Sequence, residues 1–91
     1  MPKITMPKIT IYTTDYCPYC VKAKVLLQKK QVAFEEIKIA SDEMRDAMIV
    51  KSGGRRTVPQ IFIGEKHIGG CDDLYELDRQ KKLDELLRSF L

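Results

Sequence analysis

The stretch KITIYTTDYCPYCVKAKVLLQKK, residues 8–30, contains the change of periodicity that decides the fold. Its first part alternates apolar and polar residues, with Ile9 and Ile11 on one face, as is typical of a β-strand. Residues 19–30 instead have the spacing of an amphipathic helix with lysines on its polar side. The residues expected on the buried side of that helix are Val21, Val25 and Leu26. Two cysteines three positions apart, Cys17 and Cys20, lie where the strand pattern gives way to the helical one.

Alternation returns in residues 32–39, which predicts a second strand. Two strands joined by one helix form a β-α-β unit, in which the strands pair in parallel through a right-handed crossover. A second helix is expected to begin at Ser41-Asp42-Glu43, because these residues provide an N-cap and acids for the first turn. Gly53-Gly54 should end it. Its expected buried face consists of Met44, Met48 and Ile49.

The segments PQIFIG and KHIGG, residues 59–64 and 66–70, read as two short strands joined by a turn at Gly64-Glu65. Asp72 or Asp73 is the expected cap of a third helix, and residues 82–91 are expected to add one or two amphipathic turns. The resulting order β-α-β-α-β-β-α predicts an α/β fold in which helices flank a four-stranded mixed sheet.

The composition agrees with one globular domain. The chain has 91 residues, of which 44% are hydrophobic and 32% charged, and its formal net charge is +3. Basic and acidic residues are interleaved, so a mild preference for anionic ligands is expected and nucleic-acid binding is not. The sequence shows no signal-peptide pattern and no apolar run near the ~20 residues of a membrane span. We therefore expect a cytoplasmic protein without a membrane partner, monomeric in solution.

The N-terminus reads MPKIT twice, at residues 1–5 and 6–10. Five residues are too few for a structural repeat. We interpret the duplication as a second in-frame start or a remnant of cloning. Residues 1–7 are therefore expected to be a tail, and residues 8–91 the folded domain.

A C-x-x-C pair serves metal sites, structural disulfides and redox chemistry. Three cysteines in a cytoplasmic chain argue against a structural disulfide. Structural zinc needs four ligands, and the remaining candidates, His67 and Cys71, are separated by Gly69-Gly70. A redox pair is favoured because Cys17 would lie at a helix start, where free N–H groups and the helix dipole stabilise a thiolate. The zinc site remains the alternative.

A proline precedes a buried strand in RTVPQIFI, residues 56–63. Proline at such a position marks an ordinary loop-to-strand junction or a cis peptide bond. A cis Val58-Pro59 bond would leave the backbone groups of Val58 free to pair with an extended peptide-like ligand.

Three motifs together carry a family resemblance: Cys17-Pro18-Tyr19-Cys20, Thr57-Val58-Pro59 and Gly69-Gly70-Cys71-Asp72-Asp73. From about residue 8 to its end, the chain resembles a dithiol glutaredoxin of the small bacterial type. The resemblance implies a thioredoxin fold and a glutathione-dependent oxidoreductase that reduces protein disulfides and glutathione mixed disulfides. It implies glutathione as cosubstrate and no metal.

The resemblance also implies roles for individual residues. Cys17 would be the nucleophile and Cys20 the resolving cysteine. The expected glutathione-binding residues are Tyr19, Lys51, Arg55, Thr57, Val58, Pro59, Cys71 and Asp72. Of these, the N–H groups of Cys71 and Asp72 would hold the γ-glutamyl carboxylate. Lys51 and Arg55 would meet the glycyl carboxylate.

The chain departs from the family at Thr14, where many members carry a lysine that contacts glutathione and favours the thiolate. A weaker glutathione affinity is therefore expected. Some family members hold an iron–sulfur cluster between two subunits, and this carrier function is the other alternative. For Cys71 and His67 we expect a small buried side chain and a half-exposed strand residue, respectively.

Overall fold

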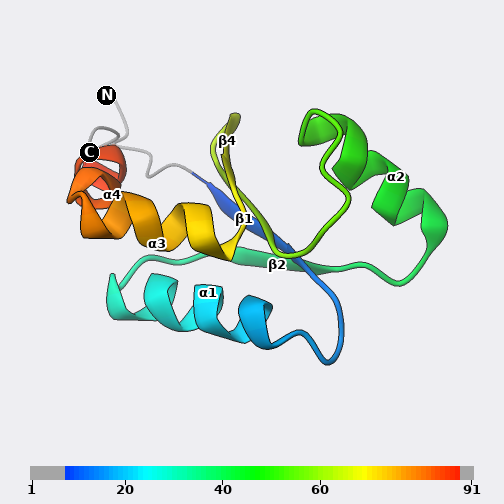
Figure 1. Cartoon of the computed structure of the whole chain (residues 1–91), viewed down its shortest axis with the longest axis horizontal. Helices are drawn as coiled ribbons and strands as arrows, with labels where there is room; N and C mark the ends of the chain where they lie inside the picture. Colours follow the sequence, from blue (N-terminus) through cyan, green and yellow to red (C-terminus); the bar gives the residue numbers. More distant parts are fainter. Residues whose placement is uncertain (1–7, 89–91) are drawn as a thin grey trace, which may run out of the picture.

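Four short strands form one mixed sheet in the order β2-β1-β3-β4 (Figure 1). This computed structural model describes residues 8–88. The strands are β1 (Ile9–Thr13), β2 (Glu35–Lys38), β3 (Gln60–Ile63) and β4 (Lys66–Gly69). β1 pairs with β2 in parallel, while β3 is antiparallel to both β1 and β4. The predicted four-stranded mixed sheet and the hairpin at Gly64-Glu65 are thus confirmed.

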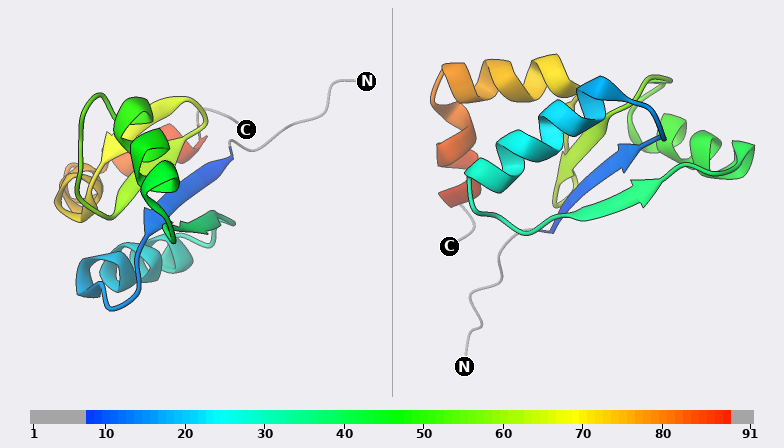
Figure 2. Two further views of the ribbon diagram at one scale, coloured as in Figure 1. Left: turned by 90° about the vertical axis from the view of Figure 1, so that its right-hand side faces the viewer. Right: turned by 90° about the horizontal axis from the view of Figure 1, so that it is seen from below.

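The four helices are α1 (Pro18–Lys29), α2 (Asp42–Lys51), α3 (Cys71–Arg79) and α4 (Lys82–Arg88). Helices α1, α3 and α4 cover one face of the sheet and α2 covers the other (Figure 2). Lys30, the residue after α1, links the three helices on the first face. Its Nζ lies 2.6 Å from Asp78 of α3 and 3.0 Å from Asp84 of α4.

The larger core lies between the sheet and α1, α3 and α4. Alternate residues of β1 and β3 contribute isoleucines to this core from the sheet, and the helices contribute leucines. Its fully buried side chains include Ile11, Leu27, Ile61, Ile63, Leu74 and Leu83. The smaller core under α2 contains Tyr12, Met48 and Phe62, with the Tyr12 and Phe62 rings packed edge to face at 5.8 Å. The two cores hold β1 and β3 at the centre of the sheet.

The predicted buried stripe of α1 is wrong in two of its three residues. Val21 and Val25 are 55% and 39% exposed, and only Leu26 is buried. The buried face is formed instead by Cys20, Ala23, Leu26 and Leu27. Two of these residues, Cys20 and Ala23, are small, so they contribute little to a hydrophobic pattern although both are buried.

Two boundaries and one buried face also differ from expectation. β2 spans only Glu35–Lys38, although alternation begins at residue 32. The N-cap of α3 is Gly70, and neither Asp72 nor Asp73 occupies that position. Met44 and Ile49 of α2 are half-buried, whereas Met48 is fully buried. The expected N-terminal tail, residues 1–7, lies outside the described residues.

Candidate functional site

The C-x-x-C pair lies at the N-terminus of α1. Cys17 is the N-cap residue, with extended backbone angles, and Pro18 occupies the first helical position, where its missing N–H costs nothing. The Cys17 sulfur accepts the backbone N–H of Cys20 at 3.1 Å, and a disulfide joins the two cysteines, whose Cα atoms are 5.2 Å apart. A sulfur in this position receives one of the free N–H groups of the helix, and the helix dipole favours negative charge on it.

The two sulfurs differ in access. Cys17 is half-buried, whereas Cys20 is only 2% exposed. An external thiol or disulfide can therefore reach Cys17 and not Cys20. This asymmetry suits an outer cysteine that exchanges with substrates and an inner one that reacts only with its neighbour.

A groove of about 300 Å³ opens beside Cys17. It is lined by Tyr19, Arg55, Thr57, Val58, Pro59, Gly70, Cys71, Asp72 and Asp73. The carbonyl oxygen of Val58 lies 4.0 Å from the Cys17 sulfur, which joins the groove to the cysteine pair. The Val58-Pro59 peptide bond is cis. The structure thus brings together every residue that the sequence assigned to the groove, with the exception of Lys51.

Lys51 lies at the end of α2, on the other face of the sheet. Its Nζ donates a hydrogen bond to the Tyr12 hydroxyl at 3.3 Å and lines a separate hollow of about 460 Å³ that contains neither cysteine. The expectation that Lys51 meets a ligand beside Cys17 is therefore not supported by its position. The family resemblance alone suggested this role, and the last turn of α2 directs the Lys51 side chain toward Tyr12 of β1.

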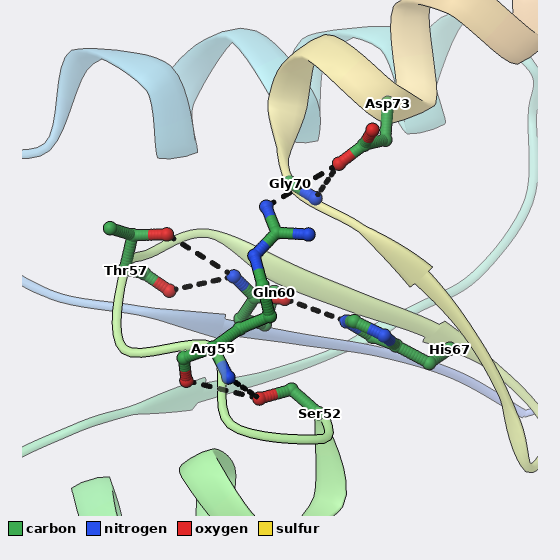
Figure 3. A network of polar contacts seen from close by, with 7 residues as sticks. All are labelled: Ser52, Arg55, Thr57, Gln60, His67, Gly70 and Asp73. Carbon is green, nitrogen blue, oxygen red and sulfur yellow. Dashed lines mark hydrogen bonds and ion pairs between the residues drawn. The ribbon is translucent and has the colours of Figure 1, made fainter.

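The opposite wall of the groove is the start of α3 (Figure 3). Asp73 accepts the Gly70 N–H at 2.9 Å and lies 3.5 Å from the Arg55 guanidinium. Arg55 therefore spans from the loop before β3 to the first turn of α3, and its charge offsets that of Asp73. The free N–H groups at the beginning of this helix face the same groove, an arrangement that suits a carboxylate.

Asp15 lies two residues before Cys17, and its carboxylate would oppose a Cys17 thiolate if it faced the sulfur. The structure pairs the Asp15 carboxylate with Lys38 at 3.1 Å, and both side chains are largely exposed. This ion pair raises the pKa of Lys38 above its ordinary value. Because Asp15 is directed toward β2, its repulsion of a Cys17 thiolate is weakened by the paired lysine and by solvent.

Cys71 and His67 have different surroundings. The Cys71 side chain is buried in the core, and this burial, together with the charge of Asp72, raises the pKa of its thiol. His67 is half-buried on β4, where burial and the charge of Arg55 lower its pKa. Within residues 8–88 no three His, Cys, Asp or Glu side chains are grouped as a metal site would require. The zinc alternative therefore gains no support from the arrangement.

Sequence reasoning missed Gln60, whose side chain links Thr57 to His67 beneath the groove (Figure 3). It also missed the contact between Arg55 and Asp73. A signal for Gln60 existed: it is the one polar residue in the otherwise apolar strand QIFI. A polar side chain at such a position is buried only with hydrogen-bond partners.

In the described part of the chain, no helix is long and apolar enough to cross a membrane.

Comparison with known proteins gives consistent matches. The family model described as Glutaredoxin matches residues 9–68. The chain is 54% identical over 82 residues to a glutaredoxin of Pseudomonas aeruginosa, covering 90% of this chain and 98% of that one. The solution structure of a glutaredoxin from Brucella melitensis superimposes with a TM-score of 0.79 at 53% identity, covering 90% and 89% of the two chains. A crystal structure of a buckwheat glutaredoxin–glutathione complex gives a TM-score of 0.83 at 34% identity, covering 92% and 79%.

These matches span the strand–cysteine–helix unit, the Val58-Pro59 loop and the hairpin, and the fold agrees with theirs over nearly the whole chain. A thioredoxin fold with a C-x-x-C pair at the start of its first helix is what the sequence predicted, and it is confirmed. The chain therefore belongs to the glutaredoxin family, with the thiol–disulfide oxidoreductase role of that family.

Proposed function

We propose that this protein uses glutathione to reduce glutathione mixed disulfides and protein disulfides, with Cys17 as the nucleophile. The observation that carries this proposal is the position of the Cys17 sulfur. It is half-buried, it accepts the Cys20 N–H at a helix start, and it lies 4.0 Å from the backbone of a groove large enough for a short peptide. An anionic sulfur beside a peptide-binding groove suits exchange with a cysteine-containing peptide.

Glutathione would lie along this groove in an extended conformation. The backbone of Val58 would pair with its cysteine, in the manner of an added strand. The N–H groups of Cys71 and Asp72 would hold the γ-glutamyl carboxylate, since helix starts bind anions. Tyr19, 58% exposed, would form one wall together with Thr57 and Pro59.

Arg55 would act at the α3 end of the groove. Its guanidinium is 3.5 Å from Asp73, and an arginine fork suits a carboxylate. The resemblance assigned Arg55 to the glycyl carboxylate, but its pairing with Asp73 at the start of α3 favours a contact with the γ-glutamyl carboxylate instead. We do not include Lys51 in the site, because it lies at the hollow on the other face.

In the one-cysteine route, the Cys17 thiolate attacks the glutathione sulfur of a mixed disulfide. The substrate leaves as a thiolate, and Cys17 becomes glutathionylated. A second glutathione thiolate then attacks the glutathione sulfur on Cys17, which forms glutathione disulfide and restores the Cys17 thiolate. Cys20 takes no part in this route.

In the two-cysteine route, the Cys17 thiolate attacks a protein disulfide and forms a mixed disulfide with the substrate. The Cys20 thiolate then attacks the Cys17 sulfur, which releases the reduced substrate and leaves the Cys17–Cys20 disulfide. The positions of the two sulfurs support this step, because they are bonded in the structure without disturbance of α1. Two glutathione molecules return the pair to the dithiol form.

The buckwheat glutaredoxin was solved as a complex with glutathione, and its fold matches this chain with a TM-score of 0.83. That likeness supports glutathione as the ligand here. Glutathione can reduce a disulfide whose potential is about −200 to −230 mV, the range of glutaredoxins. The proposed activity therefore belongs in a compartment with a reduced glutathione pool, such as the cytoplasm, and it requires only one copy of the chain.

The test is turnover of a glutathionylated peptide by the Cys20→Ser variant, with glutathione and its recycling system as the only reductant. We expect Cys20→Ser to sustain turnover and Cys17→Ser to abolish it. The same peptide carrying a disulfide-linked cysteine in place of glutathione is the matched substrate, and it should react more slowly because it lacks the γ-glutamyl and glycyl groups.

Equal rates with both peptides would contradict a glutathione-binding groove, and absence of turnover in the wild type would contradict the proposed activity. Two further measurements address the alternatives. An iron–sulfur carrier would show visible absorbance when freshly purified, and a zinc module would contain one zinc per chain that is lost together with thiol reactivity.

A further inference from the structure

Gln60 is a polar side chain at a position where an apolar one would be expected. It begins β3, pairs with Tyr12 of β1, is followed by Ile61, Phe62 and Ile63, and has no exposed surface. A buried amide is costly unless its groups are hydrogen-bonded. Among the described residues no buried side-chain polar atom lacks a partner, so Gln60 is fully accommodated.

The partners of Gln60 lie on two sides (Figure 3). Its Nε2 donates to the carbonyl oxygen of Thr57 at 2.9 Å and lies 3.4 Å from the Thr57 hydroxyl. Its Oε1 lies 2.7 Å from Nε2 of His67. The opposite amide orientation would set two acceptors, Oε1 and the Thr57 carbonyl, against each other. The orientation is therefore fixed, and His67 must donate through a protonated Nε2.

His67 is itself held in place. Its ring packs against that of Phe62, with centroids 4.9 Å apart, and β4 pairs with β3 on this side. Burial and the nearby Arg55 charge keep the pKa of His67 low, which favours the neutral ring. The contact with Gln60 requires hydrogen on Nε2, and the neutral ring meets this requirement as its Nε2–H tautomer.

The bond to the Thr57 carbonyl determines which way the next amide points. In a trans peptide unit the C=O and N–H groups point in opposite directions. The only cis bond among the described residues is Val58-Pro59, so the Thr57-Val58 unit is trans. With the Thr57 carbonyl held inward by Gln60, the Val58 N–H is directed to the groove side. Within residues 8–88 it has no hydrogen-bond partner.

We propose that Gln60 is a positioning residue for the peptide-binding edge of the groove, and that His67 holds Gln60 in the required orientation. The two side chains fix the Thr57-Val58 peptide plane, so that the Val58 backbone meets the cysteine portion of a bound peptide next to the Cys17 sulfur. Neither side chain contacts the ligand. This inference rests on the proposed glutathione function and specifies what prepares its binding edge.

The inference predicts a selective defect, which a general loss of stability would not produce. In a Cys20→Ser background, the reduced protein is mixed with glutathione disulfide, or with bis(2-hydroxyethyl) disulfide, which has no peptide groups. With either reagent the Cys17 thiolate attacks one sulfur and releases one thiolate. The ratio of the two second-order rate constants measures recognition of the peptide, apart from the reactivity of the sulfur.

Gln60→Met keeps the length of the side chain and removes both hydrogen bonds. We expect its rate with glutathione disulfide to fall about tenfold, as for the loss of one well-oriented hydrogen bond, and its rate with the hydroxyethyl reagent to change less than about twofold. His67→Phe should shift the ratio in the same direction. His67→Gln, which retains a donor, should restore it. Leu87→Ala, which opens a cavity in the core on α4, is the stability control and should leave the ratio unchanged.

An equal loss with both reagents, or no loss, in Gln60→Met would overturn the inference, as would a normal ratio in His67→Phe. Failure of the proposed function gives a different result, because the parent Cys20→Ser protein would then show no preference for glutathione disulfide. The two failures are therefore distinguished in one set of measurements.

Discussion

The sulfur of Cys17 accepts the backbone N–H of Cys20 at 3.1 Å, so the proposed nucleophile is also the N-cap of α1. One side chain thus serves two purposes. It satisfies a free donor of the helix, and it receives the electrostatic stabilisation that an anion gains there. The local structure that starts the helix is the same structure that prepares the sulfur for exchange.

This dual role predicts different stabilities for two inactive variants. Cys17→Ser keeps an acceptor for the Cys20 N–H, whereas Cys17→Ala removes it. Because neither variant can form the Cys17–Cys20 disulfide, the comparison isolates the cap. We expect the alanine variant to be less stable by about 1 kcal/mol in urea unfolding under reducing conditions. Equal stabilities would show that the sulfur does not cap the helix.

A second prediction concerns acid stability. Thr13, which is fully buried, donates to Glu36 at 2.7 Å, and Lys24 of α1 reaches the same oxygen at 3.0 Å. These contacts, first the Thr13 hydrogen bond and then that of Lys24, lower the pKa of Glu36 below its ordinary 4.5. A lowered folded-state pKa stabilises the protein above the unfolded value, and this contribution is lost as the pH falls through the folded value.

Glu36→Gln keeps an acceptor for Thr13 and removes the titration. We expect it to be less stable than the wild type at pH 7, by on the order of 0.5–1 kcal/mol, the range for a partly exposed pair. As the pH falls below 4.5 the difference should shrink. Urea unfolding at pH 7 and at acidic pH checks this, and Glu65→Gln, at an exposed position in the turn between β3 and β4, is the control that should show neither effect. A difference that stays constant with pH would contradict the assignment.

The residues that sequence patterns could predict are those whose chemistry depends on near neighbours in the chain. The Cys17–Cys20 spacing, the proline at the helix start and the glycine turn at Gly64 act over three or four positions, and the structure contains each of them. The helix face was missed because Cys20 and Ala23 carry little hydrophobic signal, although both are buried in the folded chain, where α1 packs beside α3.

The parts of the site that could be predicted are the two groove walls, because each wall is formed by a recognisable sequence motif. The loop at Thr57-Val58-Pro59 and the start of α3 were both identified, and they line one groove. What connects the walls was not identified, because Arg55 and Asp73 meet only when the hairpin returns the chain beside the loop. The position of Lys51 could not be predicted either, since the direction of a helical side chain depends on how α2 lies on the sheet.

A third prediction follows from the close packing at Gly69. Its φ of +121° is in the region that glycine favours, and a Cβ atom there would lie 2.3 Å from Oδ2 of Asp73. Gly69→Ala must therefore displace the carboxylate that accepts the Gly70 N–H and pairs with Arg55. Both the start of α3 and the groove wall should be disturbed.

Gly54→Ala is the matched control, because Gly54 also has a large positive φ, +104°, but a Cβ atom there would have no neighbour within 4 Å. Both variants carry the backbone cost of a non-glycine residue in a sparsely populated region, about 1–3 kcal/mol. We expect Gly69→Ala to lose a further ~1–2 kcal/mol, for the displaced hydrogen bonds, and to bind glutathione more weakly. Calorimetry and urea unfolding measure the two effects. Equal behaviour of the two variants would show that Asp73 moves without cost.

The last prediction concerns Thr14, where the family resemblance suggests a lysine. Thr14 is half-buried between β1 and the cysteine pair, and the neighbouring Asp15 is already paired with Lys38. A lysine at position 14 would therefore add a cation that Asp15 does not neutralise. We expect Thr14→Lys to increase the rate of Cys17 alkylation at pH 6 by about two- to fivefold at low salt, because a nearby cation favours the thiolate. The effect should fall as salt screens the charge.

Thr14→Gln, which adds length without charge, should leave the rate unchanged. An equal increase in both variants would attribute the gain to shape and not to charge, and no increase in either would mean that the start of α1 already provides the stabilisation that the lysine supplies elsewhere in the family.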